Sequence, residues 1–324
     1  MGHGLAGAVL AHTLVQKKEQ VIVLDAGMPN SASAVSAGLI NPFIGPKLNT
    51  PEDYSECMQS NQLFFERIYN ATRIPFLEAI ELIRVFQNSE QKKRWSALPE
   101  EYKLGVLSKS ECLNHKIHAD EGAGITAAWI LHSAEFLKYS RNHFQKIGCF
   151  LNEFYEEEKW KGYRVVFCDG FRATENPWFK DLPFAPAQGE VITLESSLML
   201  NVSNGTWHLA DKEAHAVKIG STWKHDLIEC GPTDVAKNEI FKKMNFLPDI
   251  NQSKLLAHKS GVRSGTRDRN PIIGVHPDNE NLHIFNGFGS RGCTTIVQAA
   301  KELAEFMIGE IELPKRKDLK RFLS

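Results

Sequence analysis

The feature that most constrains the fold is a glycine-rich segment at the start of the chain. Residues 2–7 read Gly-His-Gly-Leu-Ala-Gly, a GxGxxG pattern, and apolar residues at helical spacing follow it. A continuous apolar run over residues 21–24 comes next and ends in Asp25. A run of this kind is typical of a parallel strand that is buried on both faces. Turn, helix and strand in this order predict a parallel α/β domain.

The residue types in this segment suit a bound diphosphate. Gly2 permits a tight turn, Gly4 lets the backbone approach a pyrophosphate, and Gly7 lets the helix pack closely on a strand. The helix N-terminus offers free N–H groups and partial positive charge to phosphates. Asp25 stands 18 residues after Gly7, where a carboxylate accepts hydrogen bonds from ribose hydroxyls. The segment predicts a Rossmann-type dinucleotide site formed by Gly2, Gly4, Leu5, Ala6, Gly7, Asp25 and Ala26.

One part of this pattern is absent from the sequence. The glycine-rich turn of such a site follows a strand, whereas only Met1 precedes Gly2. That first strand normally lies in the middle of the sheet, so its loss would leave its neighbours unpaired. We therefore expect that the first strand is missing, because the natural protein starts upstream or the sequence is truncated. A complete sheet built from residues 1–324 would contradict this expectation.

Residues 31–42 bear on the choice between NAD and FAD. Small and hydroxyl-bearing side chains crowd together here, directly after the predicted ribose-binding acid. A flat ring system and a diphosphate can lie close to such a backbone, with Ser33 and Ser36 donating hydrogen bonds. A plain Ser/Ala loop is the alternative. The cofactor-binding residues predicted from this segment are Ser33, Ser36, Ala37, Gly38 and Leu39.

Two further blocks stand in the last third of the chain. Residues 261–274 form a polar, arginine-rich turn that runs into a short apolar stretch. Residues 282–285 read as a strand, residues 286–292 as a glycine-rich turn, and residues 293–308 as a helix. Strand, glycine-rich turn and helix again direct backbone N–H groups at an anion or an electron-rich carbonyl. The hypothesis of an NAD-dependent enzyme does not explain these two blocks.

Together these blocks resemble the FAD-dependent oxidoreductase family of D-amino-acid oxidase, glycine oxidase and sarcosine oxidase. The resemblance extends over nearly the whole chain. Residues 165–170 resemble the second cofactor-side strand of the family, although its usual Ala-Thr-Gly ending is here Cys168-Asp169-Gly170. Residues 186–191 resemble the entry into the family's substrate domain. The two C-terminal blocks also look like the oxidase half of the bifunctional enzyme that modifies the wobble uridine of tRNA.

The resemblance implies an α/β fold, α+β overall, in which a Rossmann-type FAD-binding domain is interleaved with an antiparallel-sheet substrate domain. The expected FAD-binding ranges are 1–45, 120–185 and 255–324, and the substrate ranges are 46–119 and 186–254. FAD is expected to bind non-covalently. The implied activity is hydride transfer to flavin from the carbon beside the nitrogen of a small amine or amino acid. Oxygen or another acceptor then takes the electrons.

The resemblance also implies roles for single residues. Arg263 falls where glycine oxidase grips the substrate carboxylate; an ion pair with Asp268 is the alternative, and Arg267, Arg269 and Arg291 compete for the role. Lys218 resembles the oxygen-activating lysine of sarcosine oxidase, although a solvent-facing lysine fits equally. Backbone N–H groups near residue 290 would face the flavin C2 carbonyl. The cofactor-binding residues implied here are Gly170, Gly287, Gly289, Ser290, Arg291, Gly292 and Cys293.

The sequence does not decide the roles of several other side chains. Two roles, lining the substrate cavity and packing in the core, are open for Trp207, His208 and Trp223. Cys293 and His3 stand close enough to expected cofactor positions for a covalent flavin link to be conceivable, as a minor alternative. The sequence shows no obvious general base, and oxidation of a neutral amine does not require one.

The composition limits the partners, the location and the metal content expected for this protein. The net charge of −1 argues against nucleic acid, so tRNA modification is a second hypothesis. A flavin-binding protein without turnover is a third hypothesis, which the missing first strand motivates. The sequence has no apolar run of membrane-spanning length and no charged-then-apolar leader, which predicts a cytoplasmic protein. Six scattered cysteines and twelve histidines without ligand spacing predict reduced thiols and no metal. The substrate, the electron acceptor and the oligomeric state stay open.

Periodicity gives the remaining elements. It predicts an amphipathic helix over 52–69, a strand over 127–131, a helix over 134–147 with Ser133 as its N-cap, a meander over 190–223 and a helix over 234–246. Residues 75–86 fit either a helix or strands.

Overall fold

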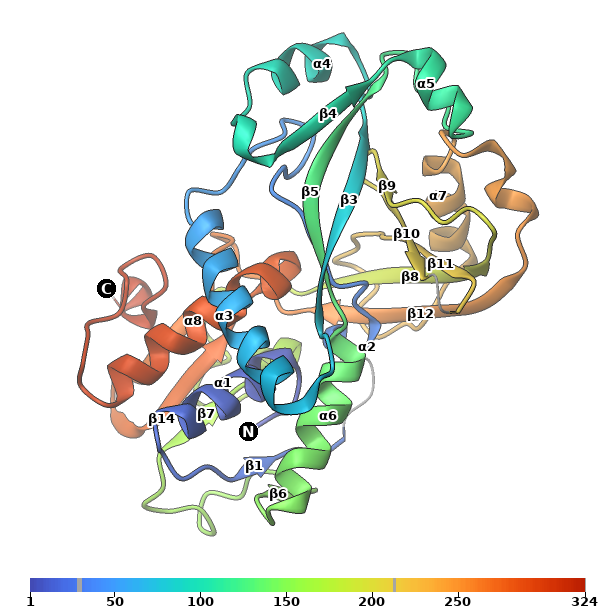
Figure 1. The fold of residues 1–324 in the computed structure, drawn as a ribbon. Helices are drawn as coiled ribbons and strands as arrows, with labels where there is room; N and C mark the ends of the chain where they lie inside the picture. The colour runs from blue at the N-terminus through green and yellow to red at the C-terminus, as the bar shows by residue number, and fades with distance from the viewer. Residues whose placement is uncertain (28–30, 212–213, 324) are drawn as a thin grey trace.

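The structure is a computed structural model that describes residues 1–27, 31–211 and 214–323. Three helices pack around the cofactor-side strands (Figure 1). They are α1 (Leu5–Gln16), α6 (Ser133–Lys146) and α8 (Gly292–Met307). Five strands form this part of the molecule: β1 (Val23–Leu24), β6 (Phe150–Leu151), β7 (Val165–Phe167), β13 (Ile272–His276) and β14 (Asn279–Asn286). The strands β1 and β6 are parallel, as are β7 and β14, so the predicted α/β fold is confirmed.

The cofactor-side strands form two separate sheets, β1-β6 and β13-β14-β7. The chain start lies between them. The terminal amine of Met1 donates to the carbonyl of Val166 at 2.8 Å, and the Cys168 amide donates to the carbonyl of Met1 at 2.7 Å. On the other side the Gly2 amide donates to the carbonyl of Leu24 at 2.8 Å. The described residues therefore do not form one continuous sheet, and an upstream strand stays a prediction.

The second part of the molecule is a nine-stranded sheet with the order β12-β8-β11-β10-β9-β3-β5-β2, in which β4 also pairs with β5. Its pairs are antiparallel except for β3 with β9. The strands are β2 (Leu39–Ile40), β3 (Leu77–Val85), β4 (Lys103–Leu107), β5 (Ala123–Leu131), β8 (Ala187–Glu195), β9 (Val202–Ser203), β10 (Trp207–Asp211), β11 (Ala216–Gly220) and β12 (Leu255–Arg263). Three of them, β2, β5 and β12, fall within ranges predicted for the FAD-binding domain, and the domain boundaries stay a proposal.

The long strands β3 and β5 form a twisted ribbon, and β4, α4 (Ser89–Ser96) and α5 (Lys109–Asn114) lie at its end away from α1 and α8 (Figure 1). Residues 77–85, which fitted helix or strand equally, are therefore a strand. The other helices are α2 (Ala32–Val35), α3 (Tyr54–Thr72), α4 (Ser89–Ser96), α5 (Lys109–Asn114) and α7 (Asp234–Lys243). Short 3-10 turns are η1 (Glu100–Tyr102), η2 (Gly170–Thr174), η3 (Pro248–Gln252), η4 (Gly289–Arg291) and η5 (Leu319–Phe322).

The predicted N-cap of α6 is wrong. The helix begins at Ser133 itself, with His132 at the N-cap position. The Ser133 hydroxyl donates to the carbonyl of Ser33 at 2.9 Å instead of accepting from a helical amide. This contact joins α6 to the small-residue segment around α2, and a partner 100 residues away in the sequence leaves no local signal.

Two buried histidines predict acid sensitivity of the fold. The ring of His12, on α1, lies among aromatic rings of α3 and α6, including Tyr139 at 5.8 Å and Phe144 at 5.0 Å. Burial, with smaller effects of nearby histidines, lowers the pKa of His12 to about 3. Burial likewise lowers the pKa of His3 to about 4. Both pKa values are depressed below the ordinary value of about 6.5.

The free energy of unfolding should therefore fall as the pH falls from 6.5 towards 4, because only the unfolded chain takes up these protons there. Each histidine contributes at most about 1.4 kcal/mol per pH unit. Denaturant unfolding at pH 7.5, 6 and 5 measures the slope. The variant His12→Leu should show a shallower slope than wild type, and His115→Leu, at an exposed position, should not. An unchanged slope in His12→Leu would contradict this assignment.

Candidate active site

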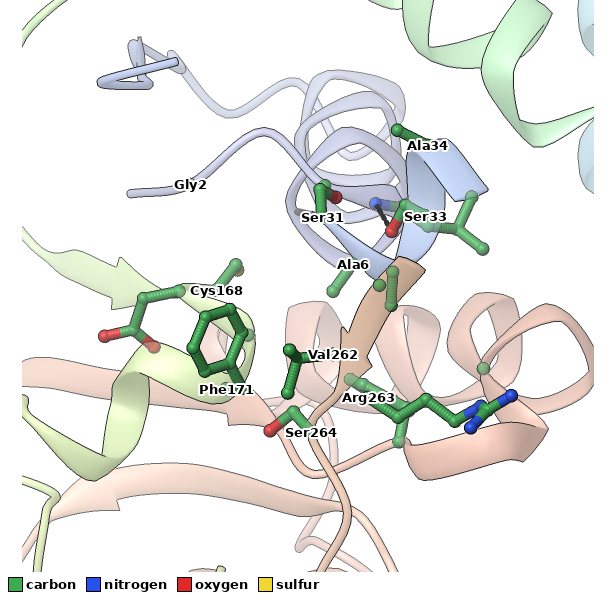
Figure 2. Close-up of a pocket in the computed structure, with 18 of the residues that line it drawn as sticks. Gly2, Ala6, Ser31, Ser33, Ala34, Cys168, Phe171, Val262, Arg263 and Ser264 are labelled. Atoms are coloured by element: carbon green, nitrogen blue, oxygen red, sulfur yellow. Dashed lines mark hydrogen bonds between the residues drawn. The ribbon is translucent and has the colours of Figure 1, made fainter. Parts of the chain in front are cut away.

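A cavity of 960 Å³ lies between the two parts of the molecule. Figure 2 shows Ala6, Ser31, Ser33 and Ala34 on one side of this cavity. Across it lie Val262 and Arg263 at the end of β12 and the following Ser264, with Cys168 and Phe171 at its side. Most of the predicted cofactor-binding residues meet in its lining. They are Gly2, Gly4, Leu5, Ala6, Asp25, Ala26, Ser33, Ser36, Ala37, Gly38, Leu39, Gly170, Gly289, Ser290, Gly292 and Cys293.

Close backbone packing shapes the glycine-rich turn. Gly2 has φ +89°, and a β-carbon there would lie 2.6 Å from the carbonyl oxygen of Cys168. A β-carbon on Gly7 would lie 1.9 Å from the carbonyl oxygen of Gly2. Gly7 thus lies behind the turn and outside the cavity lining, where it allows α1 to pack against the turn. The Leu5 amide donates to Ser33 Oγ at 2.9 Å, so the small-residue segment is attached directly to the helix N-terminus (Figure 2).

Asp25 lines the cavity at the end of β1 and has two protein partners. Its Oδ1 accepts from the His3 amide at 3.2 Å, and its Oδ2 pairs with the guanidinium of Arg141 on α6. Arg141 also lines the cavity and lies over the ring of Phe150, 4.5 Å from its centre. Sequence reasoning missed Arg141, because a single arginine on an amphipathic helix reads as solvent-exposed.

The turn between β14 and α8 presents backbone to the cavity. Gly289, Ser290 and Gly292 line it, whereas Gly287 and the Arg291 side chain do not. Arg291 donates to Asp53 Oδ1 at 2.8 Å and is thereby directed away from the cavity. At this turn the backbone, and not the Arg291 side chain, therefore faces the cavity.

Of the four candidate arginines, Arg263 is the one that lines the cavity. Its Nη2 donates to Ser221 Oγ at 2.7 Å and its Nη1 to the carbonyl of Thr222 at 3.1 Å. The alternative ion pair with Asp268 is not formed, because Asp268 pairs with Arg321 at 2.9 Å. Burial lowers the pKa of Arg263 to about 10, which keeps the side chain cationic at neutral pH.

The contacts of Arg263 leave room for an anion. A guanidinium has five N–H donors, and two of them are engaged by the described residues. Neither acceptor is charged, and the described residues place no carboxylate within ion-pair distance of Arg263. Arg263 is half-buried, and a cation that is partly withdrawn from water is stabilised where a charge partner completes its hydrogen bonds. The site therefore suits a ligand that carries a carboxylate.

The structure does not bring Lys218 into the cavity. It lies on β11, opposite Leu209 and Thr193, and is absent from the cavity lining. Its position along the strand explains this: Gly220, two residues further on, pairs with Val191 and Trp207, which do line the cavity. An oxygen-activating role for Lys218 has no geometric support here.

The structure places the three aromatic candidates differently with respect to the cavity. Trp207 lines the cavity, whereas His208 is buried away from it, with Nδ1 2.9 Å from the carbonyl of Leu200. Trp223 lies outside the lining and stacks on Arg263.

Asp169 is a cavity residue that sequence reasoning did not assign. It follows β7, lines the cavity and accepts from Asn176 Nδ2 at 2.9 Å and from Asn286 Nδ2 at 3.1 Å. Burial raises the pKa of its carboxyl group. The only signal in the sequence was the departure Cys168-Asp169-Gly170 from the family's usual ending, which marked the position but not its role.

Cys293, at the start of α8, lines the cavity with its Sγ 3.7 Å from Ser36 Oγ. Burial raises the pKa of this thiol, and a protonated thiol is a poor nucleophile, which fits non-covalent cofactor binding. Across the described residues, no cluster of three or more His, Cys, Asp or Glu side chains could hold a metal ion. Within the same part of the chain, none of the helices combines the length and the apolar character needed to cross a membrane.

The glycine-rich helix N-terminus, Asp25 at the end of the adjacent strand and the sheet-lined cavity with its half-buried arginine define a dinucleotide-dependent enzyme. The family model DAO, described as FAD dependent oxidoreductase, matches residues 1–306. The chain belongs to this family, and its cofactor is FAD.

Relatives agree with this assignment. Glycine oxidase of Pseudomonas putida is 21% identical over 95% of this chain and 93% of that protein. The match to glycine oxidase of Pseudomonas aeruginosa, 25% identical, covers 46% of this chain and 43% of that protein. The tRNA 5-methylaminomethyl-2-thiouridine biosynthesis bifunctional protein MnmC of Maricaulis maris is 23% identical over 96% of this chain, which spans about half (52%) of its length. The crystal structure of glycine oxidase from Geobacillus kaustophilus superposes with a TM-score of 0.80 at 19% identity, covering 98% of this chain and 96% of that one.

Proposed function

We propose that this enzyme oxidises the C–N bond of a small amine that carries a carboxylate. The observation that supports this most directly is Arg263, a cavity-lining cation whose protein partners are both uncharged. A guanidinium binds a carboxylate through two parallel hydrogen bonds and thereby fixes its orientation. The glycine oxidase relatives act on an amine of this class, as their name states.

Orientation is the main contribution of the protein in this proposal. FAD, when bound, supplies the acceptor for the hydride. Arg263 holds the carboxylate, so the C–H bond beside the nitrogen takes a fixed direction in the cavity. Trp207 and Val191 also line the cavity, and both lie opposite Gly220 of β11. The amine reacts in its neutral form and leaves as an imine, which water hydrolyses to a carbonyl compound and the released amine or ammonia.

The test is the visible absorption spectrum of the purified holoenzyme under anaerobic conditions. Glycine, sarcosine and other amino acids should bleach the flavin bands, whereas methylamine and dimethylamine, which lack the carboxylate, should not at equal concentration. If the amino acids are first added as a mixture, dividing this mixture into smaller groups then identifies the substrate. Equal bleaching by both classes, or a spectrum that persists with all of them, would contradict the proposal. Reoxidation in air or by an added dye separates oxygen from another electron acceptor.

A second candidate is oxidation of a carboxymethylaminomethyl group on tRNA. The alignment with MnmC over 96% of this chain favours it. The same arginine would then bind the carboxylate of a modified nucleoside. This candidate predicts an affinity for tRNA that falls steeply with salt, and flavin bleaching by tRNA carrying the group but not by free amino acids. The cytoplasmic location predicted from the sequence stays a prediction under either candidate.

A further inference from the structure

We propose that Trp223 is a positioning residue for the substrate carboxylate: its indole, held by His225, keeps the Arg263 guanidinium directed at the cavity. The inference rests on the proposed function, because it concerns the arginine that binds the carboxylate. Trp223 does not line the cavity itself, so any effect on binding must pass through Arg263.

Three consecutive residues contact Arg263. Ser221 and Thr222 accept its two hydrogen bonds, and the ring of Trp223 lies 4.8 Å from its Cζ. Elsewhere the guanidinium lies against Gly189 on β8, where a β-carbon would stand 2.2 Å from Nη2. A stacked indole attracts a guanidinium through the negative face of the ring. The start of this loop thus fixes the side chain between β8 and the indole.

The indole is held by a hydrogen bond and not by burial. Trp223 is 46% exposed, which a side chain placed for core packing would not be. Its Nε1 donates to His225 Nε2 at 2.9 Å. His225 Nδ1 lies 2.8 Å from the carbonyl of Pro186 and donates to it. With its proton on Nδ1, the imidazole leaves Nε2 free to accept from Trp223.

Both ends of the loop 221–233 are attached to one residue of β8, Glu190. The Glu190 amide donates to Thr222 Oγ1 at 3.1 Å. Its carboxylate is buried and accepts from the Thr233 amide at 2.8 Å and from Thr233 Oγ1 at 3.0 Å. Arg172, which lines the cavity, donates to Glu229 in the same loop at 2.8 Å. The loop therefore has a fixed position relative to the strand that supports Arg263.

A long side chain that is already oriented loses less conformational freedom when it binds a ligand. Removal of the indole should weaken carboxylate binding and leave the chemical step alone. For Trp223→Leu we expect the Kd of acetate and the KM of the amino-acid substrate to rise about tenfold. The limiting rate of flavin reduction should stay within about twofold of wild type, since Trp223 does not touch the reacting atoms. Trp223→Phe keeps a ring without the N–H, so its acetate Kd and its KM should lie between those of wild type and those of Trp223→Leu.

The experiment uses the holoenzyme and titrates acetate against the flavin absorption bands, then measures anaerobic flavin reduction by the amino acid. Tyr163→Leu, which removes another exposed aromatic side chain (55% exposed) away from the site, is the matched control and should behave as wild type. His225→Leu tests the same contact from the other side and should reproduce part of the Trp223→Leu effect, even if the latter variant does not fold.

The two proposals fail in different ways. No acetate binding in wild type, with equal turnover of amines with and without a carboxylate, would remove the proposed function and this inference with it. Acetate binding in wild type that stays unchanged in Trp223→Leu and His225→Leu would overturn the inference alone. A fall in the limiting rate without a change in acetate Kd would also overturn it, since that pattern assigns Trp223 to another role.

Discussion

Replacing Arg263 by methionine is expected to lower kcat/KM for the carboxylate-bearing amine by about 100-fold. Methionine fills a similar volume without the guanidinium, so the variant loses two charge-assisted hydrogen bonds to the carboxylate. Hydrogen bonds to charged groups contribute about 1.5–3 kcal/mol. The loss also includes orientation, because a substrate that is not gripped presents its C–H bond in many directions. Steady-state and anaerobic stopped-flow kinetics measure the two parts separately.

The chain offers matched controls for this variant. Arg267 stands on the same turn but is exposed and lies outside the cavity lining, so Arg267→Met should leave kcat/KM within about twofold of wild type. Arg263→Lys keeps the charge but loses the planar fork, and should lose about tenfold. Methylamine, which lacks a carboxylate, should bleach the flavin bands of neither wild type nor Arg263→Met at the concentration used for the amino acid. Equal kcat/KM for the amino acid in both would remove Arg263 from the binding site.

The parts of the site that were predictable are those set by neighbours in the sequence. The turn at Gly2–Gly7 and the acid at Asp25 follow from backbone rules that act over about one helix and one strand. The same holds for the strand–turn–helix at residues 282–308, which the structure places as β14, η4 and α8. For Ser33 and Ser36 the sequence left an ordinary Ser/Ala loop as the alternative, and the structure places both in the cavity lining.

The parts that were not predictable depend on contacts between distant segments. The pairing of Arg141 with Asp25 spans 116 residues, and that of Arg291 with Asp53 spans 238. No periodicity distinguishes such arginines from solvated ones. Lys218 is the opposite case, a residue that was proposed for the site but lies outside the cavity lining. Alternation along β11 did not decide which face its side chain occupies, and its position along the strand places it away from the cavity. Asp169 was visible only as a departure from a family pattern.

The same reasoning separates two kinds of arginine in the chain. Arg291 and Arg321 each have a carboxylate partner in the described residues and are structural in this sense. Arg263 has two uncharged acceptors and a tryptophan. Motif position alone left four arginines in competition. Arg263 is the candidate among the four that both lines the cavity and has no carboxylate partner in the described residues, and we therefore propose it for the substrate.

Replacing Gly7 by alanine is expected to abolish retention of FAD. The added β-carbon would stand 1.9 Å from the carbonyl oxygen of Gly2, and backbone cannot rotate aside as a side chain can. Either α1 moves or the turn at Gly2 opens, and both would displace the backbone N–H groups that would hold the diphosphate of FAD. Overpacking of this kind costs about 1–3 kcal/mol. We expect the flavin content of the purified variant to fall more than tenfold, measured as the ratio of absorbance at the flavin band to that of protein.

Gly105→Ala is the matched control, because its β-carbon would meet nothing closer than Ile125 Cδ1 at 3.9 Å, on a strand away from the cavity. It should retain FAD as wild type does. Thermal unfolding of the apoproteins separates binding from folding: added FAD should raise the Tm of wild type and of Gly105→Ala, since a ligand that binds the folded state stabilises it. The Tm of Gly7→Ala should not respond to the same FAD concentration. A Gly7→Ala variant that is purified yellow with a wild-type flavin ratio would show that the turn does not make the diphosphate site.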